Sequence, residues 1–448
     1  MPDESSHAVT LEALTHVADV PELFRRVAEG GSLGDGSDAA LLAAFGLSEL
    51  ASPAHALDPD LRSVLRAAGH LTRLFRLPAP DAPGLAFVGG TVAPASYGLD
   101  PNIYPASSVS GRGFAPRPAF LGCIGEAVEH LSRLEWGDET FDGRGRAPPR
   151  NMGAESAAAL VAALAPDEEA DWLPARRVCD GAETAVPAGL CLVRRSGSSR
   201  PPSSGCAAGA TFDDACLAGL LELVERDAAA LWWHGGRPAK PLAAEVLSIA
   251  LGARIADLRQ GAAERATWIL DITTDVEIST IAAVSVDPDG FGLACGLAAR
   301  PSVTEAARAA FLELCQMELA NRLVALKLHR AGEGALAPVE QRHRRRMTKV
   351  DANEDRRLTA KGAPRPHRDE PAPGSARGQI AWAAERLARV GIEAFAVDLT
   401  RPMVGIPAVR VVAPMLQTLP AVSRTARLTQ AMVQHRSPPY DSSDIDLI

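Results

Sequence analysis

The sequence lacks the features of membrane, secreted and nucleic-acid-binding proteins. No apolar run in its 448 residues reaches the ~18 that a membrane-spanning helix requires. The acidic start MPDESSHAVT has no apolar core of a secretory signal. The formal net charge of −9 argues against a nucleic-acid binder, which usually carries a basic face. We therefore expect a cytoplasmic protein that binds neither nucleic acid nor membrane.

Common metal and nucleotide motifs are also missing. The seven cysteines contain no CxxC pair and no Cys/His spacing typical of zinc. Three of them, Cys123, Cys216 and Cys315, fall in apolar helical patterns, where we expect buried thiols. The chain has no P-loop, no dinucleotide-binding GxGxxG after a strand, no HExxH and no GxSxG. Any ATP site must therefore be built without a common loop motif.

The apolar pattern divides the chain into four regions. Residues 1–80 predict a small helical N-terminal region, and the Pro-rich segment 78–84 marks its boundary. Residues 81–329 alternate strand-like stretches with long helices and predict the core of a mixed α+β fold. Residues 330–377 are polar and Pro-rich, which predicts a flexible linker or loop, and residues 378–448 complete the core. The predicted strands are 85–90, 106–111, 189–195, 266–274, 279–287, 290–298, 393–400 and 407–414.

Two short polar segments receive separate interpretations. The basic run QRHRRRMTK within 330–377 is either a docking site for an acidic partner or a solvated loop, and we favour the loop because charge runs often mark disordered segments. The tail QHRSPPYDSSDIDLI is expected to be extended.

One acidic pattern occurs three times along the chain. A glycine-bearing stretch leads into a helix with an acid, followed three residues later by a second acid or an amide: Glu126 and Glu129, Glu222 and Glu225, Glu313 and Gln316. An alanine stands seven residues before each first acid, and a glycine stands thirteen before it in the first two copies (Ala119, Ala215, Ala306; Gly113, Gly209). Residues i and i+3 share a helix face. Three such faces brought together can hold a hard cation and, with it, a polyphosphate.

The second copy carries the densest chemistry. Arg226 lies four residues after Glu222, so its fork can reach a phosphate beside an ion held by the acids. The alternative is an exposed Glu222–Arg226 ion pair on an ordinary helix. The glycine-rich entry SSGCAAG, which permits close approach of a ligand to the backbone, and the recurrence of the acidic face both favour the binding site.

The other two copies differ from the second. In the first, Arg112 lies between two glycines on a turn that can reach a polyanion. In the third, Gln316 keeps an oxygen ligand but removes a charge. Glu305 and Glu318 do not fit the spacing and are expected to be solvated.

Together these motifs resemble the YcaO family over roughly residues 85–430. The stretch SSGCAAGATFDDACLAGLLELVERDAAALWW follows the family's Ser-x-Gly-x-Ala-x-Gly…Glu-Leu-x-Glu-Arg-Asp-Ala…Trp-Trp pattern. SGRG…GEAVEH is similar to its Ser-Gly-Lys-Gly…Gly-Glu-x-x-Glu-Arg segment, and VTEAARAAFLELCQ to its Glu-Ala…Glu-x-x-Gln segment. The late GIEAFAVDLTRPMVGIPAVRVVAPMLQTLP is similar to its closing strands.

The resemblance implies a YcaO-type α+β fold in which ATP and Mg²⁺ serve to phosphorylate a backbone amide oxygen of a peptide. It implies Mg²⁺-phosphate ligands at Glu126, Glu129, Glu222, Glu225, Glu313 and Gln316. Arg226 would contact phosphate and act in catalysis together with Glu222 and Glu225. The nucleotide would be lined by Arg112, Ser203, Ser204, Gly205, Ala207 and Gly209.

Three departures from the family pattern stand out. Arg112 replaces the usual Lys and keeps its charge, and His130 replaces an Arg or similar residue. The Pro-x-Pro-x-Pro ending of azoline-forming members is absent, since Pro438 and Pro439 lie upstream of a polar tail that ends at Ile448. The last departure bears on the azoline product but not on the ATP site.

The resemblance leads to three functional alternatives. The first is a cyclodehydratase subunit that converts Cys, Ser or Thr of a ribosomally made precursor peptide into thiazoline or oxazoline rings. It would act with a separate leader-binding protein resembling ubiquitin-activating enzymes, with a flavin-dependent dehydrogenase, and as a homodimer within a larger complex. The second is a thioamide-forming enzyme with a TfuA-like partner. The third is a non-catalytic ATP-binding scaffold.

Overall fold

The computed structural model describes residues 20–34, 36–52, 57–145, 151–163, 169–195, 200–262, 265–366, 373–419, 424–437 and 447. The chain divides into two compact units. The first comprises residues 1–131, 256–263 and 402–406, and the second comprises 132–255, 264–401 and 407–448. Among the described helices, none is long and apolar enough to cross a membrane.

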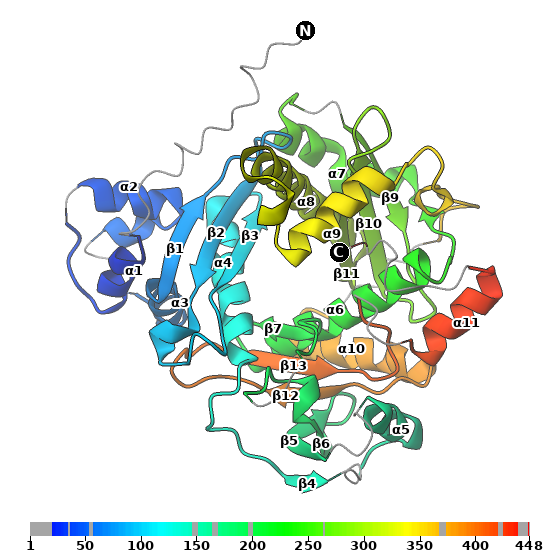
Figure 1. The fold of residues 1–448 in the computed structure, drawn as a ribbon, viewed down its shortest axis with the longest axis horizontal. Coiled ribbons are helices and arrows are strands. Elements are labelled where there is room, and N and C mark those ends of the chain that lie inside the picture. The colour runs from blue at the N-terminus through cyan, green and yellow to red at the C-terminus, as the bar shows by residue number, and fades with distance from the viewer. Residues whose placement is uncertain are drawn as a thin grey trace. The chain divides into compact units, whose positions relative to one another are not determined.

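The first unit combines a three-stranded antiparallel sheet with helices. Its sheet has the order β1-β2-β3, seen in blue and cyan in Figure 1. The strands are β1 (Leu71–Arg76), β2 (Ala86–Val92) and β3 (Ser107–Gly113), and the helices are α1 (Val20–Ala28), α2 (Gly36–Ala44), α3 (Pro59–Gly69) and α4 (Pro116–Ser132), with short 3₁₀ turns η3 (Ser48–Ala51) and η4 (Pro94–Tyr97).

Local sequence signals explain the elements of this unit. Asp58 caps α3 by accepting from the Leu61 N–H at 2.9 Å, next to Pro59 in the first turn. The rings of Phe24, Phe45 and Phe120 pack together with centroids 5.1–5.7 Å apart.

Two expectations for the N-terminal part need correction. Residues 71–76 form strand β1 rather than a helix, because they pair with β2. The segment 78–84 is not a boundary between compact units, because the first unit continues to Leu131.

The second unit contains two sheets. One has the order β11-β10-β9-β8, and the other β4-β5-β12-β13-β7 with β6 paired to β5. The strands are β4 (Gly143–Gly145), β5 (Ala170–Arg177), β6 (Glu183–Pro187), β7 (Cys206–Ala208), β8 (Lys240–Pro241), β9 (Ala266–Asp271), β10 (Ser279–Val286), β11 (Ala294–Arg300), β12 (Phe395–Asp398) and β13 (Ala408–Val412). The predicted strand at 189–195 is wrong: a 3₁₀ turn, η5 (Ala188–Leu190), and a single bridge at Val193 occupy it.

Helix α6 (Phe212–Trp233) is the central helix of this unit. It contacts β7 and β13 of one sheet and also β10 and β11 of the other (Figure 1). Its buried residues, among them Leu220, Val224 and Trp232, explain why the flanking sequence is so apolar. The other helices are α5 (Ala154–Ala162), α7 (Ala244–Arg259, whose end belongs to the first unit), α8 (Val303–Ala331), α9 (Pro338–Lys349), α10 (Ala376–Arg389) and α11 (Ala426–His435), with 3₁₀ turns η6 (Glu333–Ala335) and η7 (Arg356–Leu358).

Glycines allow close contact between strand and helix in the repeated units. A Cβ at Gly111 in β3 would collide with the Ala119 carbonyl of α4, and a Cβ at Gly296 in β11 would collide with the Ala310 carbonyl of α8. In the second copy, a Cβ at Gly209 would lie 2.5 Å from the Ala215 nitrogen. The three alanines of the repeat, Ala119, Ala215 and Ala306, are fully buried. The repeat therefore reflects one packing solution: a helix lying directly on its preceding strand.

The flexible linker expected at 330–377 is corrected by the structure. The basic run forms helix α9, whose Arg346 is fully buried. The segment that follows packs on two tryptophans, because Trp232 Nε1 donates to the Arg357 carbonyl and Trp268 Nε1 to the Leu358 carbonyl, both at 2.8 Å. Residues 367–372 of the segment lie outside the described part. The composition of residues 330–377 could not predict these contacts, because the two tryptophans are distant in sequence.

The polar tail expected at 434–448 is only partly described. Gln434 and His435 end helix α11, and residues 438–446 and 448 lie outside the described residues. Leu447 is fully buried in the apolar cluster of Trp232 and Trp233, and its carbonyl accepts from Arg346 Nη1.

Candidate functional site

Three charged side chains on α6 form the centre of the candidate site. The helix begins with a capping box between Thr211 and Asp214. An acidic face starts at Glu222, about two turns after the buried Ala215. Arg226 Nη2 lies 3.3 Å from Glu222 Oε1, and Arg226 Nη1 lies 3.0 Å from Glu225 Oε1. The predicted clustering of these three residues is thus realised within one helix.

Burial makes this cluster unlike a surface ion pair. The Arg226 side chain is 16% exposed and that of Glu225 is 9% exposed. Burial, together with the charges of Glu313 and Glu222, raises the pKa of Glu225 to about 7, and Arg226 and Arg300 limit the rise. Burial lowers the pKa of Arg226, but the surrounding carboxylates outweigh it and hold that pKa above the usual range. The interpretation as an exposed Glu222–Arg226 pair is therefore wrong.

Two more residues act on the cluster from the third copy. Glu313 on α8 interacts electrostatically with both Glu225 and Arg226. Arg300, the last residue of β11, interacts with Glu225 and was missed by sequence reasoning. The signal was present, because Arg300 stands thirteen residues before Glu313, at the position where the other copies have glycine. Gln316 lies on the same face as Glu313, three residues further along α8.

The first copy, in the first unit, has its own acidic pair on α4. Glu126 Oε2 accepts from the Ser110 N–H at 2.7 Å and from the Ser110 hydroxyl at 3.2 Å. Glu129 lies three residues further on the same helix, and Arg112 lies two residues after Ser110 in β3. The structure therefore brings Glu126 next to the SGRG motif of its own copy.

The first two copies fix their first acid in the same way. The Gly205 N–H donates to Glu222 Oε2 at 3.0 Å, as the Ser110 N–H donates to Glu126. In each case the donor is a backbone group from the strand region that precedes the helix. Such a bond favours the ionised carboxylate and orients it, while other lone pairs of the carboxylate stay available for a cation.

The glycine-rich entry 203–209 has mixed roles. Gly205 has a φ of +87°, and a Cβ there would lie 2.5 Å from the Val411 carbonyl oxygen, so only glycine fits. The Ser204 hydroxyl is buried and donates to the Leu419 carbonyl at 3.3 Å. Ala207 is buried in strand pairing with Val409. Ser204 and Ala207 thus support the loop from inside the fold.

The remaining two loop residues lie nearer the surface. Ser203 is exposed, and its carbonyl accepts from Arg410 Nη1 at 3.1 Å. Gly209 is held by its N–H, which donates to the Pro407 carbonyl at 3.0 Å. Nucleotide contacts stay a prediction for the residues named from the sequence: Arg112, Ser203, Ser204, Gly205, Ala207 and Gly209.

Outside the cluster, one expectation about burial is wrong and three are confirmed. Glu318, expected to be solvated, is 1% exposed and accepts from the Ser285 hydroxyl at 2.6 Å. Its spacing from Glu313 directs it toward the sheet rather than the acidic face. The thiols Cys123, Cys216 and Cys315 are buried as predicted.

Comparison with known proteins identifies the family. Residues 110–417 match the family model described as YcaO cyclodehydratase, ATP- and Mg²⁺-binding. The chain belongs to the YcaO family. A relative from Rhizobium leguminosarum bv. trifolii, an uncharacterised protein in the tfuA 3′ region, is 28% identical in an alignment of 370 positions that covers 72% of this chain and 80% of the relative.

Solved structures share the fold of this YcaO chain. A heterocyclase in complex with substrate and cofactor has a TM-score of 0.64 at 20% identity, covering 84% of this chain and 55% of that one. YcaO from Methanopyrus kandleri bound with AMPPCP and Mg²⁺ has a TM-score of 0.53 at 18% identity, covering 83% and 90%. The E. coli microcin synthetase McbBCD complex has a TM-score of 0.54 at 14% identity, covering 77% and 88%. The chain thus spans about half the length of the heterocyclase, and the mixed α+β fold is confirmed as YcaO-type.

ATP and Mg²⁺ are the cofactors of the family, and the α6 cluster fits them. Carboxylate oxygens are the ligands that Mg²⁺ prefers, and a guanidinium suits phosphate. Glu222, Glu225 and Glu313 would hold the metal, and Arg226 would contact phosphate. Within the described part of the chain, Arg226 Nε is buried without a hydrogen bond, and Nη1 lies 3.0 Å from Glu225 Oε1 without hydrogen-bond geometry. A phosphate oxygen would satisfy these donors, and a divalent cation would relieve the repulsion among the carboxylates.

Among the described residues, no three Asp, Glu, His or Cys side chains are already arranged to bind a metal ion. Glu222 and Glu225 pair with Arg226 instead. Metal binding therefore requires these carboxylates to exchange Arg226 for the cation, which frees the guanidinium for phosphate. The roles of Glu126, Glu129 and Gln316 as metal ligands stay predictions.

Proposed function

We propose that this YcaO chain is an ATP-dependent cyclodehydratase acting on the backbone of a ribosomally made peptide. The observation that carries the proposal is the buried cluster on α6, in which one guanidinium with unsatisfied donors lies among three carboxylates. Such a cluster suits transfer of a phosphoryl group, which needs positioning and charge neutralisation rather than a protein nucleophile. The family's description as a cyclodehydratase supports the same reaction.

The reaction replaces a poor leaving group by a good one. The side chain of Cys, Ser or Thr adds to the preceding carbonyl carbon, and the former amide oxygen departs, so that one water is lost per ring. Mg²⁺–ATP supplies the phosphoryl group that this oxygen carries away as phosphate. Arg226 would stabilise charge on the transferred phosphoryl, and Gly205 would keep Glu222 oriented through its N–H at 3.0 Å.

Isotope transfer tests the proposed activation. Peptide substrate labelled with ¹⁸O at the reacting carbonyl would be incubated with the chain, its partner proteins and Mg²⁺–ATP. We expect the released phosphate to contain the label. Label-free phosphate, formed while the peptide is modified, would exclude amide-oxygen activation. Absence of both ATP turnover and peptide modification, with the partners present, would favour a non-catalytic scaffold.

A second product is favoured by one specific observation. The relative from Rhizobium leguminosarum bv. trifolii lies in a tfuA 3′ region, and the match covers most of that protein. Under this alternative, an external sulfur donor attacks the activated amide, a thioamide forms, and a TfuA-like protein is the partner. The α6 cluster would serve the same activation step in both reactions.

Mass spectrometry of the modified peptide distinguishes the two products. Loss of one water per site identifies cyclodehydration, whereas exchange of one oxygen for sulfur identifies thioamidation. The flanking genes give an independent indication. A leader-binding protein and a flavin-dependent dehydrogenase favour azolines, while a tfuA-like gene favours thioamides.

A further inference from the structure

A polar cavity lies in the second unit, at the C-terminal end of α6. It has a volume of about 360 Å³ and is lined mainly by charged and polar side chains, four of them cationic: Arg237, Lys240, Arg365 and Arg427. None of its described lining residues belongs to the acidic cluster around Arg226. The volume is at the lower end of the range for small-molecule sites.

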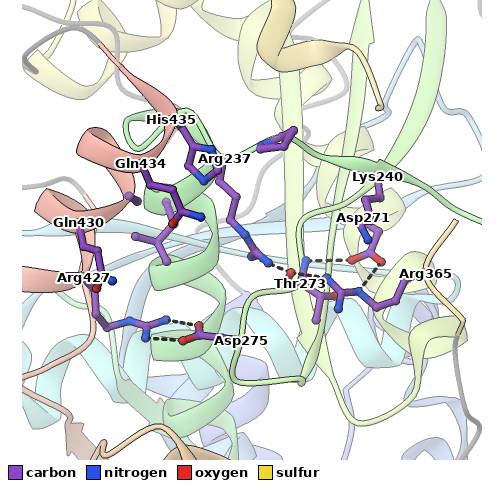
Figure 2. Close-up of a pocket in the computed structure, with 13 residues that line it drawn as sticks. Arg237, Lys240, Asp271, Thr273, Asp275, Arg365, Arg427, Gln430, Gln434 and His435 are labelled. Carbon is purple, nitrogen blue, oxygen red and sulfur yellow. Dashed lines mark hydrogen bonds and ion pairs between the residues drawn. The ribbon is translucent and has the colours of Figure 1, made fainter. Parts of the chain in front are cut away.

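Two arginines of this cavity converge on one acceptor. Arg237 Nη1 donates to the Thr273 carbonyl at 2.7 Å, and Arg365 Nη2 donates to the same carbonyl at 2.9 Å. Figure 2 shows both guanidinium groups directed at Thr273. Two guanidinium groups that donate to the same carbonyl lie close enough to repel each other, so the arrangement is costly unless an anion lies between or beside them. Burial and the neighbouring Arg365 accordingly lower the pKa of Arg237.

The carboxylates of the cavity do not balance its cations. Asp275 pairs with Arg427 at 2.7 Å, as Figure 2 shows, and Asp271 pairs with Arg365 at 3.3 Å. Arg427 also pairs with the buried Asp227 at 2.8 Å. Among the described residues, neither Arg237 nor Lys240 forms an ion pair. The four cations therefore exceed the three carboxylates by one positive charge, and Arg237 and Lys240 are the two that form no ion pair, although Asp275 and Asp271 act on Arg237 electrostatically.

The opposite wall offers neutral hydrogen-bond donors. Gln430 and Gln434 lie four residues apart on α11, on one helix face, and both line the cavity. Two cations that form no ion pair, together with neighbouring amide donors, match a phosphate group, which has several acceptor oxygens and a charge of about −1.5 to −2 at neutral pH. A carboxylate carries only one charge and two oxygens, so it fits less well.

We propose that this cavity is an anion site for a phosphoryl group, separate from the acidic cluster, in which Arg237 and Lys240 contact the ligand. The ligand is either free phosphate or the phosphate of a small phosphorylated molecule. The proposal does not depend on the reaction that the acidic cluster catalyses.

Calorimetric titration of the full chain with inorganic phosphate tests the site. The titration would be made in the Glu222→Gln background, so that the acidic cluster does not dominate the signal. We expect binding that weakens about tenfold or more in Arg237→Gln and in Lys240→Gln, since hydrogen bonds to charged groups are lost. Lys240 is exposed at the cavity mouth, so its variant reports on binding even if Arg237→Gln unfolds. Arg389→Gln, on the exposed face of α10, is the matched control.

The comparison of probes identifies the ligand class. AMP binding that is tighter than that of inorganic phosphate and is weakened in Lys240→Gln would assign the site to a phosphorylated small molecule, and equal or weaker binding would assign it to free phosphate. Phosphate affinity that is the same in Lys240→Gln, in folded Arg237→Gln and in the control would overturn the proposal. Acetate that binds as tightly as phosphate would also overturn it.

Discussion

Arg226 and Glu225, which are adjacent on α6, form a buried ion pair at 3.0 Å. Adjacent helix positions do not normally face each other, and the pair forms because both side chains turn toward the space shared with Glu222 and Glu313. The consequence is a compact centre of opposite charges whose balance depends on every member.

Replacing Arg226 should abolish ATP turnover. For Arg226→Ala we expect kcat for ATP hydrolysis to fall by about 10²–10³, because the contact with the transferred phosphoryl is lost. Arg226→Lys should recover only part of the activity, since Lys cannot form the fork. Glu222→Ala should likewise abolish turnover. Phosphate release would be measured beside the thermal midpoint, with Arg389→Gln as the control. Wild-type turnover in folded Arg226→Ala or Glu222→Ala would refute the site assignment.

Arg300 should affect ATP binding through its position beside Glu225. Arg300 is the last residue of β11. Its guanidinium donates to the Ala299 carbonyl at 2.7 Å and counteracts the rise in the pKa of Glu225. In Arg300→Gln we expect Glu225 to hold its proton to a higher pH. Because Mg²⁺ binds the ionised carboxylate, the KM for Mg²⁺–ATP should rise about fivefold or more at pH 7. The check is a set of KM values at pH 7 and pH 8.5.

The pH dependence separates this role from a structural one. At pH 8.5 a larger fraction of Glu225 is ionised in both proteins than at pH 7, so the difference in KM between Arg300→Gln and wild type should shrink. A difference that is the same at both pH values would show that Arg300 acts by packing or by direct contact alone.

Sequence reasoning captured the residues whose spacing encodes their geometry. Glu222, Glu225 and Arg226 could be placed together because they share one helix, and Glu313 because its copy repeats theirs. Arg300 was missed because the third copy departs from the repeat at that position. The contacts of the basic helix α9 were missed for another reason. Arg346 is buried against Leu447, about a hundred residues later in the chain, and composition carries no information on such a partner.

Alanine at the interface glycines should destabilise the chain. At Gly111 and Gly296 an added Cβ collides with helix backbone, which cannot move aside as a side chain can. We expect a loss of roughly 1–3 kcal/mol at each site, seen as a fall in the thermal midpoint of several degrees. Gly125→Ala is the matched control, because a Cβ there meets nothing within 4 Å. Gly125→Ala should raise the thermal midpoint slightly, since Ala is a better helix former than Gly. Equal midpoints in all three variants would contradict the packing argument.

His343 on α9 should make the stability of the chain fall in mild acid. Its Nδ1 lies 3.0 Å from Arg346 Nη2, from which it accepts a hydrogen bond when neutral. Burial, together with Arg346 and Arg342, lowers the pKa of His343 from 6.5 to about 4. Between these values the unfolded chain binds a proton that the folded chain does not, so stability decreases as pH falls from 6.5 toward 4.

The His343→Gln variant isolates this contribution. Gln keeps an acceptor for Arg346 but does not titrate, so the variant should lose less stability than wild type between pH 7 and pH 5, by on the order of 1 kcal/mol. Thermal midpoints at both pH values measure the difference, and His329→Gln, at an exposed position of α8, controls for the loss of one imidazole. If wild type and His343→Gln lose the same stability on acidification, the imidazole must be charged in the folded protein. Arg346 would then have to rely on the Leu447 carbonyl rather than on His343 for its hydrogen bonding.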